Sequence, residues 1–130
     1  MIAVDTNVLV RLIVADDAVQ GERAAGLFAR TAEVFIAKTV VLETAWVLRS
    51  AYGFPRQDVA AALRRVAGLP NVVIEDAEQV AVALDLASRD VDVADALHVA
   101  ACREASAFYT FDRRLIRHGD AVGITVTEPE

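Results

Sequence analysis

Four acidic residues stand at positions where their carboxylates need an explanation. Asp5 and Asp112 each follow a short apolar run that is typical of a strand, whereas Glu43 and Asp95 lie inside predicted helices. Carboxylate oxygens are the ligands that Mg²⁺ and Mn²⁺ prefer. A divalent cation held in this way can activate water for attack on a phosphodiester. The chemistry that these residue types allow is therefore metal-assisted hydrolysis.

Glu43 is the most informative of the four. Its helical neighbours three and four positions away are Thr39, Val40, Trp46 and Val47, and none of them is basic. A partly buried carboxylate without a basic partner is costly unless another charge compensates it. An exposed strip of helix is the ordinary interpretation of Glu43, and a ligand for a cation is the sharper one.

Asp95 has a similar environment. Asp92 stands three positions before it and His98 three positions after it, so two acids share a helix face with no adjacent arginine. Acids in the first turn of a helix interact favourably with its dipole. That explanation is sufficient for Asp92, which is either a cap or an extra acid of the site. It is weaker for Asp95, which lies further into the helix.

Asp5 and Asp112 share the order of apolar run, acid and helix. Both are natural N-caps. The carboxyl ends of parallel strands also open on one side of a sheet, so both acids can face one cleft, with Glu43 and Asp95 nearby. Two bare carboxylates roughly 4 Å apart repel by about 4 kcal/mol near a protein surface. If all four converge, the site needs either a raised pKa or a divalent cation.

A zinc site is the competing metal interpretation. Asp95, His98 and Cys102 fall on one helical face, and His118 is the only other soft donor. Zinc usually takes three or four ligands. The ligand count therefore favours packing residues at the rim of a pocket over a zinc centre.

Strand and helix patterns alternate along the chain. Strand patterns cover residues 1–4, 34–37, 71–75, 107–110 and 124–128, and helix patterns cover residues 16–30, 39–53, 56–70, 76–89, 92–105 and 112–119. Thr39 and Asp76 are the expected caps of their helices. Residues 8–15 are ambiguous, because their β-branched side chains favour a strand and the preceding polar residues favour a helix. The alternation predicts an α/β fold, a three-layer α/β/α sandwich with a central, mainly parallel sheet.

The composition predicts one cytoplasmic domain spanning residues 1–130. The chain is 55% hydrophobic and 6% aromatic, which suits helices packed on a buried parallel sheet. The single Cys102 fits a reducing compartment. Asp5 and Arg11 interrupt the early apolar stretch, so we expect neither a signal peptide nor a membrane span.

The net charge of −6 argues against a protein that simply coats nucleic acid. It does not exclude an enzyme that acts on nucleic acid, because acids gathered in one pocket lower the total charge. Lys38 is the only lysine, and the other basic residues are arginines, which suit bidentate contacts to phosphate.

With these residues placed, the chain resembles the PIN-domain nucleases, particularly the VapC toxins of bacterial and archaeal toxin–antitoxin pairs. The resemblance covers essentially the whole chain. It rests on four motifs in order, AVDTNVLVRL at residues 3–12, LETAWVLR at 42–49, DVADALHVAAC at 92–102 and YTFDRRL at 109–115.

The resemblance implies that Asp5, Glu43, Asp95 and Asp112 form an acidic, metal-binding and catalytic site. Asp5 and Asp95 match the surest metal ligands, and Glu43 a ligand or the group that orients the attacking water. The second-shell positions, which would orient the acids, are Thr6, Asn7 and Thr110. Asp92 is a possible extra acid.

By the same resemblance, the activity is Mg²⁺-dependent hydrolysis of RNA, with Mn²⁺ able to substitute. The partners would be the RNA substrate, a cognate antitoxin and a second copy in a homodimer, with no membrane. Two other functions fit parts of the sequence. A non-catalytic module that binds RNA or protein would use the acids only as caps. A phosphotransfer enzyme would need a lysine on a late strand, and Lys38 falls early.

Overall fold

The computed structural model describes the whole chain, residues 1–130. Its elements follow the predicted alternation of strands and helices. In chain order they are β1 (Ile2–Ala3), α1 (Thr6–Ile13), α2 (Ala18–Arg30), β2 (Val34–Ile36), α3 (Lys38–Ser50), α4 (Arg56–Ala67), β3 (Val72–Ile74), α5 (Ala77–Ala87), α6 (Val93–Ala101), β4 (Ala107–Tyr109), α7 (Arg113–Gly119), the 3₁₀-helix η1 (Asp120–Val122) and β5 (Thr125–Thr127).

All strand pairs are parallel, so the prediction of an α/β fold with parallel strands is confirmed. The strands are divided between two sheets, however, one with the order β1-β2-β3 and one that pairs β4 with β5. The expectation of one central sheet is corrected in this respect. Alternation of strands and helices predicts parallel neighbours, but nothing within a strand of two or three residues selects which strand lies beside it.

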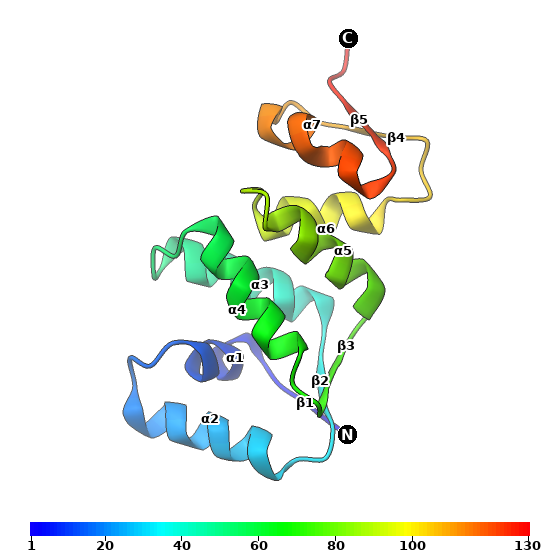
Figure 1. Ribbon diagram of the computed structural model, residues 1–130. Helices are drawn as coiled ribbons and strands as arrows, with labels where there is room; N and C mark the ends of the chain where they lie inside the picture. The colour runs from blue at the N-terminus through cyan, green and yellow to red at the C-terminus, as the bar shows by residue number, and fades with distance from the viewer.

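The two sheets lie towards opposite ends of the molecule, with α3, α4, α5 and α6 between them, and the two chain termini lie at opposite ends as well (Figure 1). A continuous core of 27 buried residues joins these elements. Leu9, Ile36, Leu48, Leu86 and Val99 are among the side chains that it buries completely. Burial of this kind stabilises the fold by about 1.5–3 kcal/mol for each large apolar side chain.

The ambiguous residues after Asp5 form the helix α1. Asp5 is its N-cap, and a carboxylate oxygen accepts a hydrogen bond from the Thr6 N–H at 2.7 Å. The helix buries Leu9 and Val10 against the core. The cap and the amphipathic spacing therefore prevail over the strand preference of the valines.

Helix α3, which carries Glu43, begins at Lys38, so the expectation that Thr39 caps it is wrong. The cap comes instead from a distant part of the chain, because the Lys38 N–H donates to Glu75 Oε1 at 2.8 Å. Asp76 occupies the N-cap position of α5 as predicted, but its side chain makes no capping hydrogen bond. It pairs with the Lys38 ammonium at 2.7 Å. Residues just after β3 thus hold the start of α3.

None of the helices combines the length and the apolar character needed to cross a lipid bilayer.

Replacing Glu75 by Ala should lower the free energy of unfolding by about 1 kcal/mol, because the first turn of α3 loses its acceptor. Urea denaturation measures the change. Glu104→Ala is the control, since it removes an exposed carboxylate that forms no hydrogen bond or ion pair, and it should cost less than about 0.5 kcal/mol. Equal effects of the two substitutions would show that Glu75 is not a cap.

Candidate active site

Asp5 and Glu43 line one pocket of about 310 Å³, between the start of α1 and the face of α3. Asn7, Arg11 and Tyr52 also line it. Both carboxylates are exposed at its surface, so the partial burial expected for Glu43 is not observed. Neither acid forms an ion pair, as the absence of basic neighbours in the sequence predicted for Glu43. Two unpaired carboxylates therefore face the same small volume.

The one cation in this pocket is already committed to another acid. The Arg11 guanidinium donates to Asp16 Oδ1 at 2.8 Å and to Gln20 at 2.7 Å. The Tyr52 hydroxyl donates to Asp16 Oδ2 at 2.8 Å and accepts from Arg11 at 3.2 Å. The hydrogen bond from Tyr52 and the charge of Arg11 hold the pKa of Asp16 below its ordinary value. Because Asp16 stays ionised, it offsets Arg11, and the pair Asp5–Glu43 keeps its negative charge.

Asp95 lies in a second pocket of about 310 Å³, which is bounded by α3, α4 and the start of α6. Trp46, Arg56 and Asp92 also line this pocket. Burial raises the pKa of Asp95, and the charges of Asp112 and Asp92 raise it further, while His98 and Arg56 oppose the shift. Asp95 therefore lies in a field with excess negative charge, which is typical of functional sites and of structural ion-pair networks alike.

Asp92 has basic partners, contrary to the expectation that no arginine is adjacent. Arg56 of α4 approaches Asp92 Oδ1 at 3.1 Å, and Arg49 of α3 approaches the same oxygen at 3.5 Å. Helical spacing could not show these contacts, because both arginines come from other helices. Asp92 stands at the N-cap position of α6 without a capping hydrogen bond, so its observed role is ion pairing.

A neighbouring acid, Asp90, was not singled out by the sequence. It adopts a left-handed backbone conformation with φ of 68°, and it pairs with Arg56 at 3.8 Å and with Arg114 of α7. The φ value is unusual for a residue other than Gly. The only sequence signal is the run of acids at 90, 92 and 95. Asp90 and Asp92 together connect α3, α4 and α7 through arginines.

Asp112 is the N-cap of α7, as its ordinary interpretation predicted. Its Oδ1 accepts hydrogen bonds from the Arg114 N–H at 2.9 Å and from the Leu115 N–H at 3.1 Å. The Asp112 N–H donates to the Thr110 hydroxyl at 3.0 Å, so Thr110 fixes the backbone that carries this acid. The second oxygen of Asp112 makes no hydrogen bond. Asp5 likewise uses one oxygen as a cap.

The structure arranges the predicted acids in two groups. Asp5 and Glu43 share one pocket, and Asp95 lies within the electrostatic reach of Asp112 and Asp92. No three His, Cys, Asp or Glu side chains are close enough to hold a metal ion together. The single cluster of four acids is therefore not observed. The same finding gives no zinc site at Asp95, His98 and Cys102.

A threonine with a buried hydroxyl directly follows each of the two acids, Asp5 and Glu43. Thr6 and Thr44 are the only buried residues with polar side chains, and neither hydroxyl oxygen has a hydrogen-bond partner. A buried hydroxyl without a partner is unfavourable. Thr6 and the exposed Asn7 were predicted to orient the acids, whereas Thr44 was not predicted to have a role. Its signal was a lone hydroxyl on the otherwise apolar buried face of α3.

The family model of the PIN domain matches residues 2–121, and the chain therefore belongs to the PIN-domain family. Among solved structures, the chain is similar to that of Mycobacterium tuberculosis VapC20, described as a toxin that cleaves the sarcin-ricin loop. The two are 25% identical, the match covers 96% of this chain and 97% of that chain, and the TM-score is 0.47. A search of curated proteins gave no significant match.

PIN-domain nucleases generally use divalent metal ions, and the donors of this chain suit such an ion. The candidate ligands are all carboxylate oxygens, with no thiolate or imidazole among them. Mg²⁺ is commonly held by only one or two carboxylates, with water and substrate phosphate completing its shell. The pair Asp5–Glu43 offers that number of carboxylates without a third protein ligand.

Replacing Asp95 by Asn should raise the melting temperature at pH 7. The pKa of Asp95 is raised in the folded state, so ionised Asp95 destabilises the fold. Stability linked to Asp95 is fully present below the unfolded pKa of about 3.9 and is lost as the pH rises through the folded pKa. The difference from the parent protein should therefore vanish near pH 3. Thermal denaturation over this pH range measures it.

The matched control is Asp58→Asn, which neutralises an exposed acid in the first turn of α4. This substitution removes a favourable interaction with the helix dipole, so it should lower the free energy of unfolding by about a few tenths of a kcal/mol. If Asp95→Asn lowered the melting temperature in the same way, the excess negative field around Asp95 would be disproved.

Proposed function

We propose that the protein is a Mg²⁺-dependent endoribonuclease and the toxin of a toxin–antitoxin pair. The observation that carries this proposal is the pair Asp5–Glu43, two unpaired carboxylates in one pocket whose only cation is bound to Asp16. In a member of the PIN-domain family, such a pair suits a divalent cation and a phosphodiester substrate. Mn²⁺ should replace Mg²⁺, because it accepts the same oxygen ligands.

In the proposed mechanism, Asp5 and Glu43 would hold the metal ion, and Asp95 and Asp112 belong to a second acidic group outside this pocket. The bound ion supplies Lewis acidity and positive charge beside the phosphate. If Glu43 is not a ligand of the ion, its carboxylate would instead accept a hydrogen bond from the attacking water and orient it. The caps made by Asp5 and Asp112 fix each carboxylate by one oxygen and leave the other for a ligand. The products carry a 5′ phosphate and a 3′ hydroxyl.

The remaining parts of the proposal concern the setting of this activity. Residues 1–130 act as a single PIN domain in the cytoplasm, form a homodimer and are neutralised by a cognate antitoxin protein. These statements rest on the resemblance of the four sequence motifs to the VapC toxins. The neighbouring small reading frame and the oligomeric state in solution test them directly.

Asp5→Asn should reduce RNA cleavage by about 100-fold or more, because removing a metal ligand weakens both binding and charge compensation. Asn is as good an N-cap as Asp, so the stability should change by less than about 1 kcal/mol. Asp17→Asn is the matched control, since Asp17 caps α2 by accepting from the Gln20 N–H and lies outside both acidic pockets. It should retain full activity. Cleavage by Asp5→Asn at the parental rate would refute the proposed site.

Chelation with EDTA should abolish cleavage, and added Mg²⁺ or Mn²⁺ should restore it. The same ions should raise the melting temperature of the parent protein, because a ligand that binds only the folded state stabilises it. In Asp5→Asn this rise should be much smaller. Cleavage that persists in EDTA would exclude metal-assisted hydrolysis.

One set of contacts favours a different function, a non-catalytic module that binds RNA or protein. Asp5 and Asp112 cap helices, and Asp92 is paired with two arginines, so three of these acids have structural roles. Growth arrest distinguishes the two functions. A binding module should still arrest growth when Asp5 is replaced by Asn, whereas a nuclease should not.

A further inference from the structure

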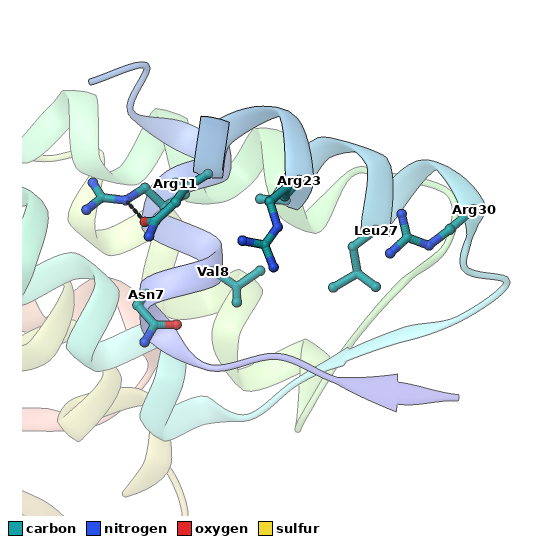
Figure 2. A pocket seen from close by; sticks show the side chains of 8 residues that line it. Asn7, Val8, Arg11, Arg23, Leu27 and Arg30 are labelled. Carbon is teal, nitrogen blue, oxygen red and sulfur yellow. Dashed lines mark hydrogen bonds between the residues drawn. The ribbon is translucent and has the colours of Figure 1, made fainter. Parts of the chain in front are cut away.

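We propose that Arg23 and Arg30 form a binding track for the RNA backbone in the groove between α1 and α2, next to the pocket of Asp5 and Glu43. This inference rests on the proposed ribonuclease function and adds to it where the substrate lies. The groove is a pocket of about 440 Å³. Figure 2 shows Arg23, Leu27 and Arg30 spaced along α2, with Val8 and Asn7 on α1.

The groove is electropositive in a protein with a net charge of −6. Three arginines line it, Arg11, Arg23 and Arg30, and no acid does. Arg11 is neutralised by Asp16. Arg23 and Arg30 form no ion pair and no hydrogen bond, and both are exposed. Two uncompensated guanidinium groups therefore share one depression of the surface.

Most other arginines either are paired with an acid or do not line the groove. Arginines that are paired with an aspartate cannot offer a free charge, and they include Arg49, Arg56, Arg64, Arg89 and Arg114. Arg114, which stands beside Asp112, is among them. Arg65 and Arg117 are exposed and free of ion pairs, but neither lines the groove or the two acidic pockets.

The two arginines lie on the same side of α2. Arg23 and Arg30 are seven positions apart on α2, which places them on one helix face about 10 Å from each other along the axis. Arg30 Nη1 would lie 3.4 Å from a Cβ added at Gly26, so this guanidinium lies against the helix surface. The planar guanidinium makes bidentate contacts with phosphate.

The groove adjoins the acidic pocket. Asn7 and Arg11 line both of them. Arg11 is held at this junction by Asp16, Gln20 and Tyr52, so its position is fixed. A strand whose scissile phosphate lies at Asp5 and Glu43 can therefore continue past Asn7 to Arg23 and Arg30.

The remaining lining indicates how a nucleotide would be recognised. Val8, Ala24 and Leu27 give the groove an aliphatic floor without an aromatic ring. Stacking on aromatic side chains is the usual source of affinity for bases. Its absence here means that the contacts are mainly to phosphate, which positions the strand without reading its sequence. An acidic peptide fits less well, because Asp5 and Glu43 at the end of the groove repel it, whereas a metal ion can join those acids to a phosphate.

Binding of a fluorescein-labelled, unstructured 12-nucleotide RNA tests the track. Fluorescence anisotropy is measured over a range of salt concentrations in Mg²⁺, in the full-length Asp5→Asn protein so that cleavage does not interfere. Adding Arg23→Ala and Arg30→Ala should weaken binding about tenfold. It should also reduce the slope of log K against log salt by about 1.4, which is the loss of two contacts to single-stranded phosphate.

The matched control is Arg65→Ala with Arg117→Ala, which removes the same charge from two exposed arginines outside the groove. Its salt slope should equal that of the parent. Equal slopes for the two double variants would overturn the track. It would also be overturned if an oligoglutamate peptide of equal charge competed with the RNA for Arg23 and Arg30 and bound more tightly.

A cleavage assay separates this inference from the proposed function. In the otherwise unchanged protein, Arg23→Ala with Arg30→Ala should raise KM for RNA about tenfold and leave kcat within twofold. If the parent cleaves RNA and the double variant has the same KM, the track is overturned and the proposed nuclease function is not. A parent that cleaves no RNA would overturn the nuclease, and the salt slopes would still decide the track. Circular dichroism confirms that each variant is folded.

Discussion

Repulsion among carboxylates is the constraint around which this structure is arranged. The helix starts near residues 90–112 collect four acids, Asp90, Asp92, Asp95 and Asp112. Arginines from other helices offset two of them, because Arg49 and Arg56 approach Asp92, and Arg56 and Arg114 approach Asp90. These contacts connect α3, α4 and α7, and they leave Asp95 in a negative field that His98 and Arg56 offset only in part. The pocket of Asp5 and Glu43 also contains an arginine that is paired with an acid, because Arg11 forms an ion pair with Asp16.

The fold and the proposed chemistry use the same side chains. Asp5 and Asp112 follow short strands and precede helices, and each caps its helix through one carboxylate oxygen. A cap holds the carboxylate in a fixed orientation, which a ligand for a cation also needs. Structural and functional interpretations of these two acids are therefore compatible. Glu43 differs from them because it has no capping role, and its position on α3 depends on the contact between Glu75 and Lys38.

Sequence reasoning predicted the elements well because each has a local signal. Asp5 and Asp112, for example, were expected as N-caps, and each caps its helix. It failed where the partner is distant along the chain. The division into two sheets, the arginines that reach Asp92 and the cap from Glu75 all join residues separated by 18 positions or more, and no local spacing rule contains them. The groove of Arg23 and Arg30 was missed for the same reason, since it exists only where α1 packs on α2.

Trp46, the only tryptophan, has a further consequence for work on this protein. It projects from α3 with 64% of its surface exposed, and it lines the pocket that holds Asp95 and Arg56. The emission of an indole changes with the polarity and the quenchers around it. Ultraviolet excitation of the unlabelled chain thus gives an optical signal from the rim of the acidic pocket. Occupancy of that pocket can be followed in real time without adding any dye.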